Sequence, residues 1–397
     1  MKTLNLRSGL LTMSSALLLA MGPARARADA LDDWSSPAQS LPTQNLKSLS
    51  YGDGRFVAVG DRGTILASAD GMEWSPMLSG VTDDLAGVAY GRQLFVAVGN
   101  AGLVLTSTNG SNWTKQATGT VESLVAVAFG GGMFVASSIF SFLTSTDGVH
   151  WLPRVAGGGP LLSIAYGNGS FFTVGGTCSW SGDCGLACCW DGQKLASSDG
   201  GTNWTVVGGG SEFGMPLWAV AFGNGRFVAG GYNPDYPGSL IVSWTNAPRW
   251  GIEWTQTERT GFRGVGFGAN QFVAVGPGMI LTSMNGRAWT SRAASGSAGL
   301  RAVAYGAWRF VAVGDAGSIL FSGDTRPLLA GRTLPQGGFE VTVRAGPENR
   351  YRLQASDDLA ATHWTDLLTF GKSPPSTNFV DRNATNFSRR FYRVVSP

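Results

Sequence analysis

One sequence pattern recurs through most of the chain and limits what the chain can fold into. An aromatic residue and a glycine are followed by three residues, a Phe and an apolar run such as FVAVG. Each copy continues with a second apolar run such as GTILAS, an Asp-Gly or Asn-Gly turn and, in most copies, a Trp. A recurring pattern of this kind indicates an array of like structural units. The seven copies are marked by Tyr51/Phe56, Tyr90/Phe95, Phe129/Phe134, Tyr166/Phe171, Phe222/Phe227, Phe267/Phe272 and Tyr305/Phe310.

Each copy predicts one sheet of four short antiparallel strands. Runs of β-branched and aromatic residues alternate with glycine dipeptides that suit tight hairpin turns. The FVAVG runs are apolar enough to be covered on both faces, and a single sheet cannot cover itself, so the sheets must stack around an axis. Gly (58 residues) and Trp (14 residues) are abundant, which also favours an all-β chain. We therefore expect a seven-bladed β-propeller.

The Trp at the end of each repeat predicts how the ring closes. Six repeats contain this Trp, whereas the seventh stops at Ser322-Gly323-Asp324. Trp34 precedes Tyr51 by 17 residues, close to the 16 residues between Trp74 and Tyr90. We expect a strand at Trp34 to complete the last blade, because a closed ring has no exposed sheet edges that invite aggregation.

The two ends of the chain differ from the repeats. Residues 1–28 have a basic start, an apolar run too short to span a bilayer and the small residues of Ala26-Arg27-Ala28, which is typical of a signal peptide. Cleavage near Ala28 would give a secreted, periplasmic or cell-surface protein with its propeller at residues 29–325. Residues 326–397 contain the alternating runs FEVTVRA, YRLQAS and RRFYRVV, which predict a small β-sandwich-like module for attachment or interaction.

The charge balance narrows the class of partner. The leader carries four of the 29 basic residues and no acidic one, which leaves 25 basic against 26 acidic residues and no basic run. Nucleic acid and anionic lipid both require clustered positive charge, so we expect neither as the main partner. We also expect no integral membrane segment, no cofactor and no metal, with a monomer as the default state.

The turns between the third and fourth predicted strands carry a recognisable motif. The segment from Ser197 to Trp204 reads SSDGGTNW and fits S-x-D-x-G-x-x-W in full. SADGMEW, STNGSNW, STDGVHW and SMNGRAW are one residue shorter, and Ser243 to Trp254 is degenerate. With these motifs the chain from Trp34 to Asp324 resembles the Asp-box (BNR) propellers of the sialidase superfamily and the seven-bladed propellers related to photosystem II stability factors.

The resemblance implies a structural role for these motifs, although their acids could instead be catalytic. In that family the Asp or Asn holds turn amides and the Trp packs between blades, away from the ligand-binding face. The chemistry agrees, because Asp and Asn bind nearby backbone amides and Gly adopts the positive φ that follows. The structural residues are Asp70, Trp74, Asn109, Trp113, Asp147, Trp151, Asp199, Trp204, Asn285 and Trp289.

Catalytic signatures are sparse. The resemblance provides no place for the arginine triad and nucleophilic Tyr of a sialidase, and two His residues, His150 and His363, cannot build a His-based triad or a multi-His metal site. A glycosidase needs two carboxylates about 5 to 10 Å apart, and the sequence leaves open which acids converge. Asp61 and Asp315 occupy equivalent places in their repeats, as does Asn100, which favours turn chemistry over catalysis. We assign no catalytic residue.

Two insertions mark the more informative region. Repeat four carries TCSWSGDCGLACCWDG and repeat five carries YNPDYPG where most repeats have a tight turn between the second and third strands. In related propellers these turns lie on the ligand-binding face, and function commonly resides on such loops. Aromatic and acidic side chains together suit stacking on sugars or docking of a peptide, unless they only pack the insertions down. The candidate binding residues are Trp180, Asp183, Trp190, Tyr232, Asp235 and Tyr236.

All four cysteines lie in the first insertion. An even, clustered set in an exported chain predicts two disulfides that staple a loop without a core of its own. The spacing is not that of a zinc site, and the connectivity stays open. The cysteines are Cys178, Cys184, Cys188 and Cys189.

Two functions are consistent with these features. The first is a non-enzymatic binding or scaffolding propeller that recognises a glycan or protein through the rim with the insertions. The second is a glycan-cleaving enzyme, either a glycoside hydrolase or a polysaccharide lyase.

Overall fold

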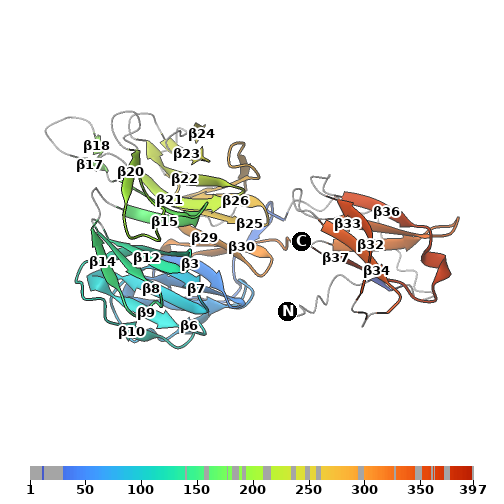
Figure 1. Cartoon of the computed structure of the whole chain (residues 1–397), viewed down its shortest axis with the longest axis horizontal. Coiled ribbons are helices and arrows are strands. Elements are labelled where there is room, and N and C mark those ends of the chain that lie inside the picture. Colours follow the sequence, from blue (N-terminus) through green and yellow to red (C-terminus); the bar gives the residue numbers. More distant parts are fainter. Residues whose placement is uncertain are drawn as a thin grey trace. The chain divides into compact units, whose positions relative to one another are not determined.

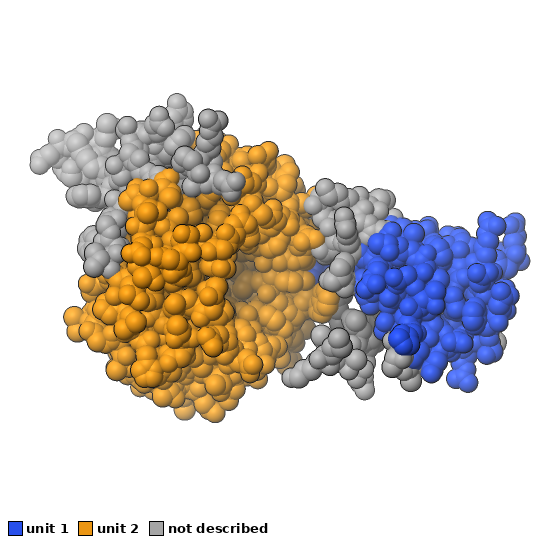
Figure 2. Space-filling view, viewed as in Figure 1, with its two compact units in different colours: residues 1–28, 324–397 blue, residues 29–323 orange. Residues whose placement is uncertain are grey.

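The computed structural model describes residues 11–12, 30–138, 141–155, 161–176, 178–180, 187–189, 194–208, 216–233, 238–245, 251–255, 261–293, 299–325, 328–344, 351–358, 361, 363–370 and 376–395. The chain forms two compact units, which Figure 2 shows in different colours. One contains Asp29–Gly323, and the other contains Met1–Ala28 with Asp324–Pro397.

The described part of Asp29–Gly323 folds into successive antiparallel sheets of four strands (Figure 1). The first three repeats follow one plan, in which the chain runs through each sheet from one edge to the other. Repeat one contains β3 (Leu46–Gly52), β4 (Arg55–Gly60), β5 (Ile65–Ser68) and β6 (Ser75–Met77). Repeat two contains β7 (Leu85–Gly91), β8 (Leu94–Gly99), β9 (Val104–Ser107) and β10 (Thr114–Gln116). Repeat three contains β11 (Leu124–Gly130), β12 (Met133–Ser138), β13 (Ser141–Ser145) and β14 (Leu152–Val155).

The next three repeats keep this plan, and repeat four adds a small hairpin. Repeat four contains β15 (Leu161–Gly167), β16 (Ser170–Gly175), β19 (Lys194–Ser197) and β20 (Thr205–Gly208), with β17 (Cys178–Trp180) and β18 (Ala187–Cys189) paired separately. Repeat five contains β21 (Leu217–Gly223), β22 (Arg226–Asn233), β23 (Gly238–Trp244) and β24 (Gly251–Thr255). Repeat six contains β25 (Gly264–Gly268), β26 (Gln271–Gly276), β27 (Met279–Ser283) and β28 (Thr290–Arg292).

The last sheet combines both ends of this unit. Repeat seven supplies β29 (Leu300–Gly306), β30 (Arg309–Gly314) and β31 (Ile319–Ser322), and β2 (Trp34–Ser35) is its fourth strand. Trp34 lies opposite Ser322, which is the pairing that the Trp34 spacing predicts. Trp34 is buried in the core of this sheet together with Leu31, and its ring N–H donates a hydrogen bond to the Leu31 carbonyl (2.9 Å).

The sheets form a ring because their innermost strands contact one another in order. β3, β7, β11, β15, β21, β25 and β29 follow one another, and β29 lies beside β3. The glycine at the end of each innermost strand receives the aromatic ring of the next repeat: a Cβ at Gly52 would overlap Tyr90, and one at Gly306 would overlap Tyr51. We call this contact the aromatic joint. It explains the repeated aromatic-Gly pair, because any side chain there would displace a packed ring.

The two ends of each sheet carry different turns. The first and second strands are joined by two-residue turns such as Asp53-Gly54, in which both residues have positive φ, the geometry that suits a twisted hairpin. The Asp-box turns lie at this same end because the strands alternate in direction. The turns between the second and third strands lie at the opposite end. Three of these are short 3₁₀ turns: η1 (Asp61–Gly63), η2 (Asn100–Gly102) and η3 (Asp315–Gly317).

A second inter-repeat contact lies at the 3₁₀-turn end, and we call it the polar joint. The middle residue of each 3₁₀ turn has positive φ, and its amide donates to a side chain just before the next innermost strand. The Arg62 amide donates to Asp84 (2.9 Å), and the Ala101 amide donates to Ser123 (3.3 Å). The Ala316 amide donates to Asn45 (2.9 Å), so this joint also spans the ring closure.

The other unit is also built from strands. One sheet contains β32 (Leu328–Thr333), β33 (Phe339–Arg344) and β36 (Ser376–Asp381). The other contains β34 (Tyr351–Ser356), β35 (Thr365–Phe370), β37 (Phe391–Val395) and β1 (Leu11–Thr12), which belongs to the expected leader. Val341 and Val343 of the first sheet share a buried core with Leu353, Ala355 and Tyr392 of the second. A short 3₁₀ turn, η4 (Ala384–Asn386), completes the described elements.

Candidate binding site at the channel mouth

The innermost strands enclose a central channel with a cavity of about 180 Å³. Its lining includes the first residues of these strands, which lie at the 3₁₀-turn end of the ring. We call this opening the mouth. The second position of each repeat's first strand, or its equivalent, contributes Lys47, Ala86, Val125, Leu162, Trp218, Arg263 and Arg301 to the lining. Three adjacent repeats (six, seven and one) therefore place cations at the mouth, and the other four place apolar side chains there.

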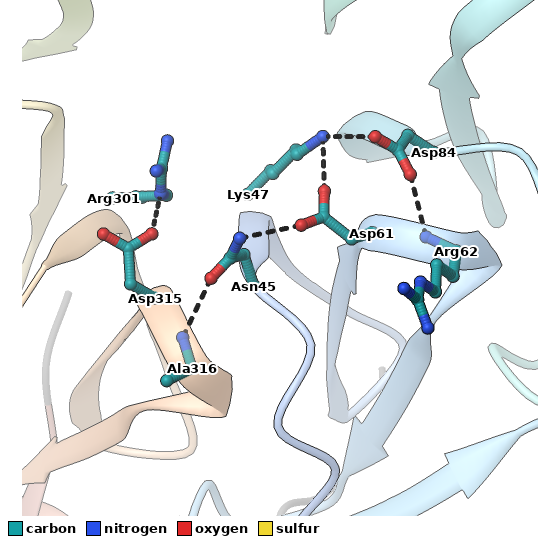
Figure 3. A network of polar contacts seen from close by, with 8 residues as sticks. All are labelled: Asn45, Lys47, Asp61, Arg62, Asp84, Arg301, Asp315 and Ala316. Atoms are coloured by element: carbon teal, nitrogen blue, oxygen red, sulfur yellow. Dashed lines mark hydrogen bonds and ion pairs between the residues drawn. The ribbon is translucent and has the colours of Figure 1, made fainter.

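The cations are held by carboxylates from the neighbouring turns (Figure 3). The Lys47 ammonium lies 2.6 Å from an oxygen of Asp61 and 3.0 Å from an oxygen of Asp84. Asp61 also accepts a hydrogen bond from the Asn45 side-chain amide (2.8 Å), so the polar joint and the charge network share residues. All three charged side chains are half-buried, which fixes the Lys47 ammonium at the channel wall.

A second part of the network surrounds Asp315. Arg301 donates a hydrogen bond to one oxygen of Asp315, and an Arg263 nitrogen lies 3.8 Å from the other. Two guanidinium groups thus share one carboxylate here, whereas two carboxylates share Lys47 in repeats one and two. The network of repeats six and seven therefore has one excess positive charge, and that of repeats one and two has one excess negative charge.

The pKa shifts follow from these contacts. The pKa of Asp84 is held below its ordinary value by the Arg62 amide and by Lys47. Burial and the neighbouring Arg301 lower the pKa of Arg263, with Asp315 opposing them. Burial lowers the pKa of Lys47, but the Asp61 and Asp84 hydrogen bonds outweigh it and the net shift is upward. Asp84 and Lys47 are therefore charged at neutral pH. The guanidinium groups remain protonated in any protein.

An aromatic platform faces the channel from repeat five. Trp218 stacks on Tyr232, with ring centroids 6.2 Å apart and planes inclined by 13°. A Cβ at Gly261, whose φ is +67°, would overlap the Trp218 ring from another side. The Gly261 amide is itself held by the Ser239 hydroxyl (2.9 Å). Trp218 is half-buried and fixed in place, so the cost of ordering it on binding is low.

The structure places only part of the candidate site expected from the insertions. Tyr232 is half-buried and contacts Trp218. Trp180 ends β17, where its backbone lies opposite Ala187, and its side chain is outside the described part of the chain. Asp183, Trp190, Asp235 and Tyr236 lie outside the described residues, as do Cys184 and the side chains of Cys178, Cys188 and Cys189.

Sequence reasoning missed Trp218 and the three cations of the mouth. Their signal was present, because Lys47, Trp218, Arg263 and Arg301 occupy one equivalent position in their repeats, directly after a buried Leu or Phe. This position is apolar in repeats two to four. Comparing the copies position by position would have shown it as the most variable point of the first strand.

The equivalent acids Asp61 and Asp315 contact side chains of the mouth in addition to shaping turns. Among the described carboxylates, Asp61 and Asp84 converge, and Lys47 lies between them. A general acid of a glycosidase needs a raised pKa, whereas that of Asp84 is lowered. The geometry of this pair therefore fits an ion-pair network better than a catalytic pair.

The Asp-box side chains are occupied by their own turns. Asp70 accepts from the amides of Met72 and Glu73 (2.8 and 3.1 Å), and Asp199 accepts from those of Thr202 and Asn203 (3.0 and 2.9 Å). The Asn203 amide, together with the side chains of Ser197 and Asn203, lowers the pKa of Asp199 to about 2. Asn109, Asp147 and Asn285 make the same pairs of bonds. Trp74, Trp151 and Trp204 donate their ring N–H to the carbonyl of the box glycine at 3.0 Å.

Two further features bear on the class of protein. Within the described residues, His, Cys, Asp and Glu side chains do not gather in groups of three or more that could hold a metal ion. None of the helices in the described part of the chain is long and apolar enough to cross a membrane.

Comparison with known proteins supports the architecture. The family model of the DUF6242 beta propeller domain matches residues 22–125. No curated protein matches the chain.

Solved structures resemble the chain at low sequence identity. YCF48 bound to D1 peptide is 16% identical, with a TM-score of 0.55 over 79% of this chain and 100% of that chain. YCF48 from Cyanidioschyzon merolae is 15% identical, with a TM-score of 0.55 over 73% of this chain and 98% of that chain. Virginiamycin B lyase from Staphylococcus aureus is 9% identical, with a TM-score of 0.59 over 73% of this chain and 98% of that chain. These matches confirm the expected fold class: the chain contains an all-β domain of the β-propeller type.

Proposed function

We propose that this protein is a non-enzymatic, seven-bladed binding propeller that holds an extended segment of a protein partner at the channel mouth. One observation carries the proposal: a fixed Trp218 platform and the paired guanidinium groups of Arg263 and Arg301 line the same opening. An apolar or aromatic residue of the partner would pack on Trp218. A partner carboxylate would lie at the two guanidinium groups, which share one carboxylate, Asp315.

The likeness to YCF48 supports a peptide as the ligand class. A structure of that protein is described as bound to D1 peptide, and the chains share their fold. In this chain the two halves of the mouth differ in charge and polarity, so a bound segment would have one preferred direction. The insertions of repeats four and five would extend the site beyond Tyr232 through Trp180, Asp183, Trp190, Asp235 and Tyr236.

This binding function would be carried out by an exported protein. Cleavage near Ala28 would release residues 29–397 as a mature protein, with residues 326–397 as a separate attachment or interaction module. The backbone register places Cys178 opposite Cys189, so we propose this pair as one disulfide of the insertion and Cys184 with Cys188 as the other. Mass mapping of the non-reduced protein tests this pairing, and a Cys178–Cys184 link would contradict it.

Selection from a displayed random-peptide library tests the proposed function. We expect enriched peptides that combine an acidic group with an apolar residue. Their affinity should fall about tenfold or more in Trp218→Ala and in the double variant Arg263→Gln/Arg301→Gln, since each loses a contact worth at least ~1.4 kcal/mol. Trp308→Ala is the matched control, because Trp308 is also partly exposed but lies in a turn at the opposite end of the ring.

Several outcomes would contradict this function. Equal peptide affinity for the Trp218→Ala variant and for the native protein would show that the mouth is not the binding site. If no peptide is enriched and a glycan binds in a way that depends on the mouth residues, the ligand is a glycan and not a protein segment. Turnover of a polysaccharide that is abolished by a single carboxylate substitution would establish the enzymatic alternative.

A further inference from the structure

A second cavity lies at the Asp-box end of the ring and has no part in the mouth. Its volume is about 540 Å³, within the usual range of about 300 to 1,000 Å³ for ligand pockets. It is formed where repeats one, two and three meet, from the first turns of repeats one and two and the Asp-box turns of repeats two and three. Its lining comprises Asp53, Arg92, Gln93, Leu94, Thr108, Thr146 and Asp147.

The turn that contributes most to this cavity carries two long side chains and lacks glycine. The corresponding turns of repeats six (Ala269-Asn270) and seven (Ala307-Trp308) also lack glycine. Arg92 and Gln93 both have positive φ (48° and 60°), as the two-residue turn requires. Asn followed by Gly is the favoured pair for such a turn, and repeats four and five use it at Asn168-Gly169 and Asn224-Gly225. Long side chains in this conformation cost backbone strain, and strain of this kind tends to occur at functional sites. In repeat two, the strained turn places two polar side chains at the cavity.

The polar groups of the lining offer both donors and acceptors. Arg92 makes one long contact, 3.5 Å from its guanidinium to the Gly132 carbonyl, and is otherwise exposed. Asp53, Thr108 and Thr146 are exposed at the rim of the cavity. Asp147 is engaged by the amides of Val149 and His150, both at 2.8 Å, and by the His150 ring nitrogen at 2.7 Å. A ligand would therefore meet a guanidinium, an amide, two hydroxyls and the Asp53 carboxylate.

The charges decide which ligand class fits. Because Asp147 is engaged by its own turn and by His150, Asp53 and Arg92 are the charges that a ligand meets. An anion would be attracted by Arg92 but repelled by Asp53, and a cation would meet the reverse arrangement. A neutral ligand rich in hydroxyl groups avoids both penalties, because each hydroxyl can donate to a carboxylate or accept from Arg92, Gln93 and the threonines. Leu94 supplies the one apolar side chain of the lining, against which a C–H face could pack. We propose that this cavity is a binding site for a neutral saccharide, independent of the mouth.

Calorimetric titration of the full chain with neutral trisaccharides (maltotriose, cellotriose, mannotriose and chitotriose) tests the site. We expect one of them to bind with a stoichiometry of one, and Thr108→Val/Thr146→Val to weaken it about tenfold or more. The double variant Arg92→Asn/Gln93→Gly restores the favoured turn, so it should lose binding while its Tm rises. A variant that is more stable and yet does not bind cannot have failed through misfolding.

Two controls show whether saccharide binding belongs to this cavity. Asn168→Arg/Gly169→Gln places the same side chains in the turn of repeat four and should leave the stoichiometry at one. Trp218→Ala should leave saccharide binding unchanged, so failure at the mouth and failure here are distinguishable. The proposal is overturned if none of the four trisaccharides binds, if binding survives Arg92→Asn/Gln93→Gly, or if a sulfated saccharide binds this cavity more tightly than its neutral counterpart.

Discussion

The aromatic joint and the polar joint connect the same neighbouring sheets, but they are built in different ways. The aromatic joint is the same at every repeat: a glycine accepts a Tyr or Phe ring, including Tyr51 at Gly306 across the closure. The polar joint uses a different side chain each time, namely Asn45, Asp84 or Ser123. Shape complementarity tolerates little variation, whereas a turn amide can donate to any suitably placed oxygen. The uniform joint thus stabilises the ring, and the variable joint leaves room for a binding site.

The largest expected effect is at the aromatic joint of the closure. Gly306→Ala places a methyl group in the Tyr51 ring and should lower the free energy of unfolding by about 3 kcal/mol, because the packed ring has no room to move. Urea unfolding measures this loss. Gly54→Ala is the control: its Cβ meets nothing within 4 Å, so only the strain of φ +74° remains, at about 1 kcal/mol. Equal losses in the two variants would show that the joint does not depend on packing.

The polar joint of the closure should matter less. Asn45→Ala removes the acceptor of the Ala316 amide and the donor to Asp61, which should cost about 1–2 kcal/mol of unfolding free energy. Ser123→Ala removes a single longer bond at an exposed turn, and we expect about 0.5 kcal/mol. Denaturant titration of both variants ranks them. A larger loss of unfolding free energy in Ser123→Ala than in Asn45→Ala would contradict a greater contribution of the polar joint at the ring closure.

The smallest expected effect is on the pH dependence of stability, which should differ between the polar joint and the aromatic joint. The pKa of Asp84 is lowered in the folded protein from its ordinary value of 3.8, so its contribution is complete above that value and is lost as the pH falls through the folded pKa. The difference in urea midpoint between the native protein and Asp84→Asn should therefore shrink from about pH 6 to about pH 3. The difference between the native protein and Gly306→Ala should not change in this way, because no titrating group is lost. A difference for Asp84→Asn that is the same at both pH values would contradict the charge contribution of this joint.

Much of the fold could be predicted because its determinants are local and repeated. Apolar runs, glycine turns and Asp-box residues such as Asp199 act within a few positions of one another, so each copy shows the same pattern in the sequence. The strand at Trp34 could be placed by its spacing alone. The core of the C-terminal unit, which combines Val341 with Tyr392, has no such repetition, and only its strands could be expected.

The candidate site depended on contacts that the sequence does not display. By itself the sequence determined the all-β class, the repeated sheets and the strand that closes the ring, because hydrophobic periodicity and turn chemistry are local. Only the tertiary structure brought Lys47, Trp218 and Arg301 to one opening and placed two guanidinium groups at Asp315. The physical reason is that a ring brings residues far apart in sequence to a common axis, where each side chain's charge and shape act on those of other repeats.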